Sequence, residues 1–470
     1  MALALVTHSY STGGPRPLAC SGLGARGNTE RRAQVACYQT TASPRQESKL
    51  ARVFRFALPT LLERGLLSRD QQRLLAELRS CRTGELGESV VRCPDCDFAY
   101  HVSHSCRDRH CPLCQNLDQE RWMQKLRQKL LDVPHYHVVL TLPSELRPLG
   151  RRHPRELFNA LCRAGSSAIA ALGRRFGVTL GAVCVLHTWT RDIRFHPHLH
   201  AVVTSAGLRD DGCLRDLSEK ALLPNDLLAA SFRTKMLDEL RALAYLVDGS
   251  VFDPSPAALA GLPETPPLPD RLRRRRRRRR LDKSPRPARP KRDPRPPPLD
   301  PVRFEAWLDS LTRLKLSRWV VYAKISLGDP KGVVAYLGRY ARRVAVSESK
   351  LLEVTEHKVI FKTKHGMTAT LTPADFTRRF LLHVLPLGFT KLRHYGLYAA
   401  AHAKRKLPEA RAALALLRGV DVAAPSAVTD TLELLSRLMG RDASICPKCG
   451  SKLLPLVRVR GPPFGGVCAA

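Results

Sequence analysis

The sequence predicts an α+β protein, in which a helical, cysteine-rich N-terminal part precedes an antiparallel sheet with helices to one side. Three observations favour this class. Cys-x-x-Cys pairs follow two stretches of helical periodicity that begin near residue 50. Between residues 136 and 204, β-branched and apolar runs occur in the order strand, helix, strand, strand. A segment rich in Arg and Pro then interrupts the chain at 253–300.

The length of 470 residues exceeds what one core can organise, so two to four domains are expected, by the rough scaling of domain size. Shifts in composition indicate where the chain divides. The predicted parts are a disordered lead-in at 1–48, a helical and cysteine-rich domain at 49–132, the first part of the sheet domain at 133–252, a disordered Arg/Pro-rich insert at 253–300, the second part of the sheet domain at 301–400 and a helical C-terminal region at 401–470.

The chain carries a net charge of +36, which indicates a polyanionic partner such as nucleic acid. Residues 271–295 contain fifteen Lys and Arg and two Asp, so they account for 13 of these charges and the excess extends through the folded part. Association with the ribosome would give the same net charge, so the composition alone does not choose between these partners. The sequence shows neither a membrane span nor a convincing signal peptide, and its fourteen cysteines indicate metal sites in a reducing cytoplasm.

The N-terminal elements are predicted to be helices over 50–62 and 70–78, followed by two cysteine knuckles and a helix over 119–131. The knuckles, 93–96 and 111–114, are separated by fourteen residues, a spacing that suits tetrahedral zinc. The predicted ligands are Cys93, Cys96, Cys111 and Cys114, with Cys106 and His110 as alternates and two ions as a further alternative. Arg107 and Arg109 stand beside the knuckles and could contact a phosphate backbone.

The sheet domain is predicted to contain strands over 136–143 and 182–189, a helix between them over 156–172, and a third strand that begins at the histidines of 196–200. In an extended strand, residues two apart point to one face, so His198 and His200 would aim at one spot while Leu199 turns into the core. Two imidazoles placed in this way could hold a divalent cation, with His196 on the same face as a third ligand or a supporting partner. A histidine-rich surface strand without metal is the alternative.

The insert at 253–300 contains eight consecutive arginines among many prolines, and it cannot bury enough apolar surface to become ordered. It could bind DNA or RNA without sequence preference, or have no particular function.

A strand over 319–324 and a helix that carries Tyr336 and Tyr340 come after the insert. The two tyrosines are four residues apart, so on a helix they lie on one face. A phenol can attack a phosphodiester, and nearby cations would stabilise the charge that develops. Those cations would be Arg339, Arg342 and Arg343. Beyond them, a hairpin over 357–372, a helix through Phe376 and half a zinc knuckle at Cys446 and Cys449 are expected.

Several motifs together resemble the two-tyrosine rolling-circle transposases of the insertion sequence 91 family, across residues 50–400. In chain order they are Ser105-Cys-Arg-Asp-Arg-His-Cys-Pro-Leu-Cys-Gln115, His137-Val-Val-Leu-Thr-Leu-Pro143, His196-Pro-His-Leu-His200, Tyr336-Leu-Gly-Arg-Tyr340, Arg378-Arg-Phe-Leu-Leu-His-Val-Leu-Pro386 and Arg393-His-Tyr-Gly-Leu397. The insert and the long lead-in depart from the family pattern.

The resemblance implies a nuclease of the His-hydrophobe-His class, with a ferredoxin-like or RRM-like sheet in its nuclease domain. His198 and His200 would bind Mg²⁺ or Mn²⁺, with His137, His187, His196 or Asp192 as third ligand. Tyr336 and Tyr340 would join to single-stranded DNA as 5′-phosphotyrosines during transposition in a bacterial cytoplasm, at the nucleoid. A plasmid replication initiator or relaxase and a non-enzymatic, zinc-dependent DNA-binding regulator are the alternatives.

Overall fold

The computed structural model describes residues 47–217, 225–244, 301–327, 332–334, 337–338, 346–419, 430–454 and 457–459, all within one unit, Arg45–Ala470. The predicted lead-in, apart from its last two residues, and the Arg/Pro-rich insert lie outside this part of the chain. The helices are α1 (Lys49–Glu63), α2 (Arg69–Arg79), α3 (Asn116–Lys129), α4 (Arg147–Arg152), α5 (Pro154–Arg175), α6 (Asn225–Arg241), α8 (Pro301–Arg313), α10 (Pro373–Leu381), α11 (Lys406–Arg418) and α12 (Thr431–Met439). The strands are β1 (Glu88–Arg92), β2 (Ala99–Ser103), β3 (His135–Thr141), β4 (Thr179–Trp189), β5 (Phe195–Leu208), β6 (Leu214–Asp216), β7 (Val321–Leu327), β8 (Leu351–Val354), β9 (Val359–Lys362), β10 (Thr368–Leu371), β11 (Leu392–Gly396) and β12 (Val457–Val459).

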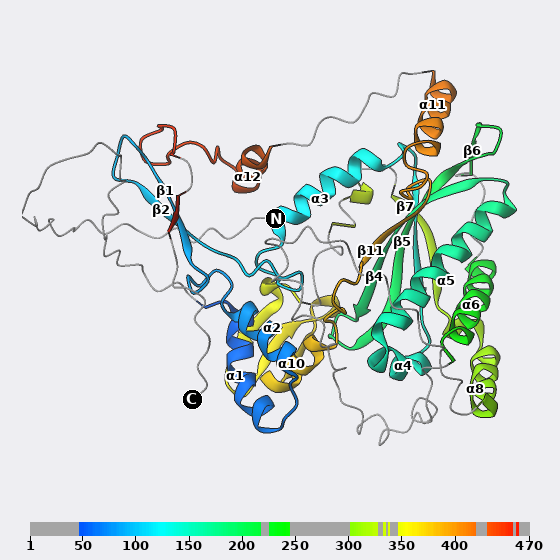
Figure 1. Ribbon diagram of the computed structural model, residues 1–470, viewed down its shortest axis with the longest axis horizontal. Helices are drawn as coiled ribbons and strands as arrows, with labels where there is room; N and C mark the ends of the chain where they lie inside the picture. Colours follow the sequence, from blue (N-terminus) through cyan, green and yellow to red (C-terminus); the bar gives the residue numbers. More distant parts are fainter. Residues whose placement is uncertain are drawn as a thin grey trace, which may run out of the picture. The chain divides into compact units, whose positions relative to one another are not determined.

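The central sheet is antiparallel, with the strand order β11-β4-β5-β3-β7 and β6 paired to β5 (Figure 1). Strand β5 lies at its centre between β4 and β3. In this register Leu199 pairs with Leu186 and Leu140, while His200 pairs with Val185 and Val139. Paired residues share a face, so the register divides the sheet into a leucine face and a histidine face.

The leucine face is covered by α5, with α6 and α8 packed beyond it in the same core (Figure 1). Helix α5 buries Leu157, Leu161, Ala168 and other residues along one stripe, as the helical period predicts. The mixed, antiparallel fold expected from the sequence is confirmed. The expectation that helices lie only to one side is wrong, because Leu126 and Leu130 of the α3 region pack against Val183 and Val202 on the opposite face.

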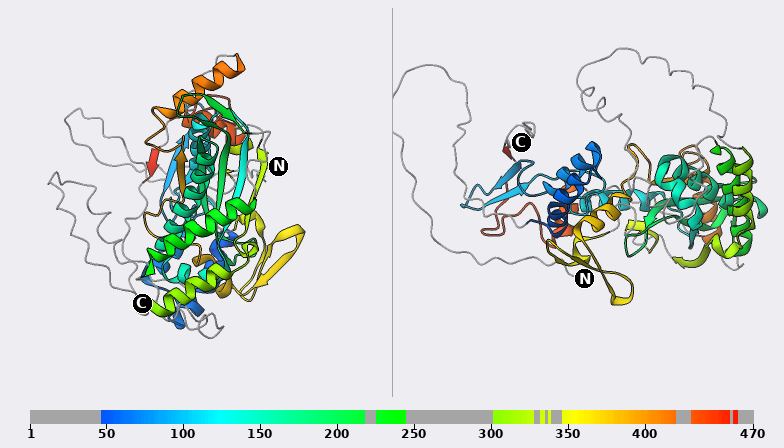
Figure 2. Two further views of the ribbon diagram at one scale, coloured as in Figure 1. Left: turned by 90° about the vertical axis from the view of Figure 1, so that its right-hand side faces the viewer. Right: turned by 90° about the horizontal axis from the view of Figure 1, so that it is seen from below.

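Helices α1 and α2 share a separate core with β8, β9 and α10, which follow the insert in sequence. Ser48 caps α1, and Ser68 with Gln71 forms a capping box on α2, so both helices begin where the sequence predicts. Strands β9 and β10 form the expected hairpin, drawn in yellow in Figure 2. The division of the chain at 132 and 301 stays a prediction, but core packing groups 351–381 with 49–79.

None of the described helices is long and apolar enough to cross a membrane.

Gly165 of α5 lets the helix approach the leucine face closely, directly behind the histidines. A Cβ at this position would stand 2.7 Å from Leu199 Cδ2 and 2.9 Å from Leu140 Cδ1. Such overpacking costs roughly 1–3 kcal/mol, whereas alanine in a helix gains at most about 1 kcal/mol over glycine.

We therefore expect Gly165→Ala to lower the free energy of unfolding, by about 1–2 kcal/mol as the balance of these two effects. Urea denaturation of the zinc-loaded protein measures this change. Ser167→Ala, on the exposed side of the same helix, serves as the control and should leave stability nearly unchanged. Equal stability of the Gly165 variant and the wild type would contradict the close packing of α5 on β5.

Candidate functional site

The histidine face of the central sheet carries a cluster of imidazoles. His187 of β4 and His198 and His200 of β5 offer ring nitrogens that all lie within 4.8 Å of one another. His198 Nε2 and His200 Nε2 are 3.1 Å apart. Neighbouring ligands of an octahedral ion with bonds of about 2.1 Å stand about 3 Å apart, so this spacing fits a divalent cation.

The protonation of these rings also fits a metal site. His198 Nδ1 donates to the backbone carbonyl of His196 at 2.7 Å; because that oxygen can only accept, Nε2 keeps its lone pair. Burial is the main cause that lowers the pKa of His198 to about 4 and that of His200 to about 2. Both rings are therefore neutral at pH 7, as metal ligands must be.

His137 of β3 stands behind His200 rather than within the cluster. The two rings stack at 5.2 Å, and His137 Nε2 lies 3.0 Å from His200 Nδ1. A proton on His200 Nδ1 would be donated to His137, which leaves His200 Nε2 for a cation. This contact suits a supporting role better than a direct bond to metal.

Among the third-ligand candidates, the structure brings His187 to the His198–His200 pair. His187 is buried, and its ring lies 4.3 Å from that of His200 between ring centres. His196 is engaged elsewhere, since its Nδ1 lies 3.2 Å from an Arg147 guanidinium nitrogen. Asp192 forms an ion pair with Arg194 at 2.6 Å. The sequence could not rank these residues because the register of β4 against β5 is a tertiary feature.

A cleft of about 980 Å³ opens over the histidine cluster. His187, His196, His198 and His200 line it from the sheet, and Trp189 extends this wall. Its other described lining residues come from the β4–β5 turn and from residues 346–367, and they include Arg191, Lys350 and Lys364 against the single acid Asp192. This balance of charge suits a polyanion.

The predicted nucleophiles Tyr336 and Tyr340, together with Arg339, Arg342 and Arg343, lie outside the described residues. Their described neighbours Val333, Val334 and Leu337 are buried on the histidine face of the sheet. Gly338 meets α3 so closely that a Cβ there would stand 2.1 Å from Met123 Sδ, which provides a packing reason for this helical glycine. Tyr322 of β7 also reaches this face, with its ring edge-on to His137.

Two separate cysteine tetrads are present, and they divide the four predicted zinc ligands between them. Cys111 and Cys114 join Cys106 and Cys81, whereas Cys93 and Cys96 join Cys446 and Cys449. Within each tetrad the sulfur atoms lie within 4.8 Å of one another, close to the separation of about 3.8 Å that tetrahedral zinc with 2.3 Å bonds requires. One site built from Cys93, Cys96, Cys111 and Cys114 is therefore wrong, and the alternative of two ions fits.

The first tetrad lies at the end of α2, where Cys81 was not anticipated from the sequence. Cys111 Sγ is 3.5 Å from Cys81 Sγ, and Cys106 Sγ is 3.8 Å from Cys114 Sγ. The alternate ligand His110 is excluded from it by other bonds. Its Nδ1 lies 2.9 Å from Asp108, and its Nε2 accepts the Leu385 amide at 3.0 Å.

The second tetrad joins segments about 350 residues apart and completes the half knuckle at the C-terminus. Cys93 Sγ lies 3.4 Å from Cys449 Sγ, and Cys96 Sγ lies 3.8 Å from Cys446 Sγ. Strand β12 pairs with β1 beside it, and Lys448 forms an ion pair with Asp97. Hydrogen bonds from Ser451 are the main cause that lowers the pKa of Cys449 to about 6, which favours the thiolate that zinc binds.

The arginines predicted to contact DNA beside the knuckles differ in their surroundings. Arg107 is exposed, whereas Arg109 donates to the backbone carbonyl of Phe389 at 2.7 Å and so ties the first tetrad to the segment before β11. Lys391 was not anticipated; its ammonium lies 4.8 Å from the ring centre of Trp189, and burial lowers its pKa to about 7.

Comparison with known proteins identifies the family. The model "Transposase zinc-binding domain" matches residues 53–142, and the model "Putative transposase" matches residues 181–406. "Putative transposase y4qJ" of Sinorhizobium fredii is 32% identical over 414 residues, which cover 84% of this chain and 92% of the relative. The chain belongs to the insertion sequence 91 family of transposases.

"Transposase for insertion sequence element IS801" of Pseudomonas savastanoi pv. phaseolicola is a further relative, 23% identical over 409 residues, or 85% of this chain and 87% of the relative. No solved structure matches the chain significantly. As a member of this transposase family, the protein is a DNA-processing enzyme with an N-terminal zinc-binding domain.

We expect this transposase to hold two zinc ions per chain, because each tetrad supplies four thiolates. Cys446→Ser/Cys449→Ser should retain one zinc ion and lose the other, as counted by inductively coupled plasma mass spectrometry. Cys213→Ser, at an exposed cysteine outside both tetrads, should retain two. Two zinc ions in the double variant would contradict the second site.

His383 follows α10 by two residues and hydrogen-bonds to Thr188 near the end of β4 and to Ile193 of the β4–β5 turn. It therefore links α10 to the turn that borders the cleft. Its Nε2 donates to the carbonyl of Ile193 at 3.2 Å, and its Nδ1 accepts from Thr188 at 3.2 Å. Ile193 has a left-handed φ of 62° although its side chain is fully buried, so its surroundings must hold this conformation. Burial lowers the pKa of His383 to about 4, so the ring is neutral in the folded protein.

In the unfolded chain the pKa of His383 is near 6.5, the ordinary value for histidine. Its contribution to stability is fully present above that pH and is lost as the pH falls towards 4, the pKa in the folded protein. Unfolding should therefore take up protons in this window. His383→Asn should reduce the pH slope of the unfolding free energy near pH 5 by about 1 kcal/mol per pH unit, since about one proton fewer is taken up. Denaturation at pH 5.0, 5.5 and 6.5 measures the slope. The exposed His357→Asn is the control, and equal slopes for the two variants would contradict this role.

Proposed function

We propose that this transposase nicks single-stranded DNA at the ends of its mobile element by tyrosine attack assisted by a divalent metal, as in rolling-circle transposition. The observation that carries the proposal is the cluster of His187, His198 and His200 at the base of a cationic cleft. The family supplies DNA as the substrate class.

The proposed reaction is a transesterification. The Oη of Tyr336 or Tyr340 attacks phosphorus, the bond from phosphorus to the 3′ oxygen breaks, and a 5′-phosphotyrosine and a 3′-hydroxyl are formed. The phenol releases one proton and the departing oxygen takes one up, so no further reactant is needed. A bound Mg²⁺ or Mn²⁺ would polarise the scissile phosphate. The histidines hold neutral ring nitrogens on a rigid sheet, and the cations of the cleft attract the strand.

One feature supports a tyrosine helix over this site, and a second argues against another tyrosine. Val333, Val334 and Leu337, which flank the first tyrosine in sequence, are buried on the face that carries the histidines. Tyr395 of β11, by contrast, packs with the core of the leucine face, and burial raises its pKa to about 12. A phenol so hard to ionise and so placed is a poor nucleophile for this cleft.

The test is covalent capture of DNA. Single-stranded DNA from the element's end, labelled on the 3′ side of the break, should remain attached to the wild-type protein after denaturation when Mn²⁺ is supplied. Tyr336→Phe/Tyr340→Phe removes both hydroxyls and keeps both rings, so it should form no adduct. His198→Ala/His200→Ala should also form none, while it binds the strand with similar affinity. The exposed Tyr100→Phe is the matched control.

An adduct in the double tyrosine variant would assign the chemistry to another residue, with Tyr322→Phe as the next variant to test. A wild-type protein that binds DNA without any adduct would favour the zinc-dependent regulator over the nuclease.

A further inference from the structure

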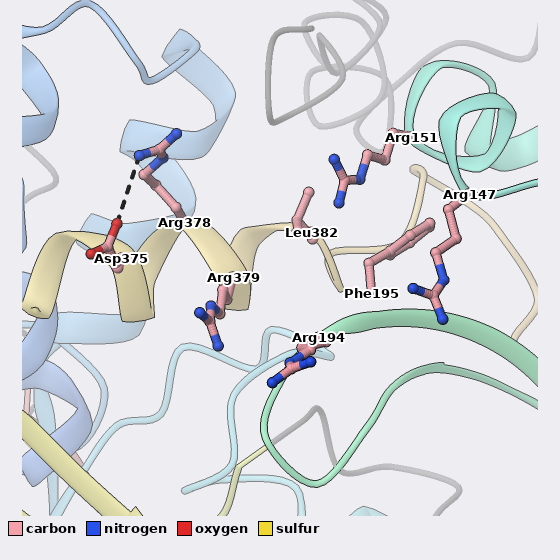
Figure 3. A pocket seen from close by; sticks show the side chains of 8 residues that line it. All are labelled: Arg147, Arg151, Arg194, Phe195, Asp375, Arg378, Arg379 and Leu382. Carbon is pink, nitrogen blue, oxygen red and sulfur yellow. Dashed lines mark ion pairs between the residues drawn. The ribbon is translucent and has the colours of Figure 1, made fainter. Parts of the chain in front are cut away.

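A second cationic cavity, of about 330 Å³, lies between α4, α10 and the start of β5 (Figure 3). Five arginines from three separate segments line it together with Phe195, Leu382 and one acid, Asp375. The arginines are Arg147 and Arg151 of α4, Arg194 of the β4–β5 turn, and Arg378 and Arg379 of α10.

The charges in this cavity are only partly neutralised by the described residues. Asp375 lies 3.7 Å from Arg378, and Asp192, outside the cavity, pairs with Arg194. The Nε atoms of Arg147 and Arg151 are buried without a hydrogen-bond partner in the described structure. Burial, and for Arg147 also the nearby Arg151, lowers the pKa of both guanidinium groups. Like charges held close together and partly withdrawn from water cost free energy that a bound anion would offset.

The cavity adjoins the histidine cleft through two contacts. Arg147 lies 3.2 Å from His196 Nδ1, and the His196 ring stands 5.3 Å from that of His198. Arg379 donates to the carbonyl of Asp192, a residue that lines the cleft. A chain of phosphates that leaves the cleft past His196 would therefore meet the arginines next.

We propose that this five-arginine cavity binds a phosphodiester group of the DNA strand next to the one in the histidine cleft. Guanidinium groups present paired donors to phosphate oxygens, and arginines on three sides of a small cavity suit one such group. The assignment rests on the proposed function for its substrate, but it concerns binding alone. A positioned phosphate would set which bond of the strand lies over the histidines.

The test measures binding of a 20-nucleotide thymidine strand with hydroxyl groups at both ends and a fluorophore on an internal base, by anisotropy over a series of salt concentrations. No divalent metal is added, so cleavage plays no part and its failure would not affect the outcome. Arg151→Gln/Arg378→Gln should bind about tenfold more weakly or worse. It should also lower the salt slope by about 0.7, the change expected when a single strand loses one neutralised phosphate.

Arg73→Gln/Arg437→Gln, at two exposed helical arginines with glutamate partners, is the matched control and should retain the wild-type slope. Arg151→Lys/Arg378→Lys keeps the charge and should restore most of the slope while affinity stays reduced. Zinc content and circular dichroism verify the fold of each variant. The proposal is overturned if Arg151→Gln/Arg378→Gln has the same salt slope as the control Arg73→Gln/Arg437→Gln. The proposal is also overturned if the variants change the salt slope only when the strand carries a 5′-phosphate, because the cavity would then bind a terminal phosphate. Full competition by inorganic phosphate at millimolar concentration overturns it as well, because the cavity would then bind free phosphate.

Discussion

The alternation of strand β5 is the constraint on which the candidate site depends. Leu199 must be buried against α5, so the residues on either side of it, His198 and His200, face the opposite way. The close approach of α5 at Gly165 holds Leu199 in place. Pairing with β4 and β3 then brings His187 and His137 alongside, because cross-strand partners share a face. A one-residue slip in register would move every one of these imidazoles.

The cysteine tetrads concern the stability of the zinc-binding region rather than the geometry of the histidine cluster. The β1–β2 hairpin and the C-terminal knuckle offer little apolar surface of their own, and four thiolates around one ion can replace a core in such a small unit. The first tetrad continues the core of α1 and α2, to which Cys111 and Ile193 also belong. Because Ile193 lies in the β4–β5 turn, the zinc-binding region and the turn that precedes the histidine strand share one hydrophobic core.

Positive charge in this protein occurs in two physically different forms. The Arg/Pro-rich segment concentrates arginines in sequence, which suits attraction to any polyanion. The arginines beside the histidine cleft are instead gathered by folding into one cavity, and the Nε atoms of Arg147 and Arg151 are withdrawn from water. The first form would attract DNA without sequence preference, whereas the second, under our proposal, would determine which phosphate occupies which position. The proposed function would use both, the first to attract DNA and the second to select one bond.

The sequence by itself determined the features with short-range periods: the helices α1, α2, α3 and α5, the strand that carries His198 and His200 on one face, the hairpin of β9 and β10, and the presence of Cys-x-x-Cys knuckles. Each follows from a repeat of 2 or 3.6 residues or from a ligand spacing within one loop. Only the tertiary structure decided that Cys81 and Cys446 complete the two tetrads and that His187 is the third imidazole. It also decided that α3 covers the second face and that five arginines share one cavity. These depend on register and on contacts between segments up to about 350 residues apart, which no local pattern encodes.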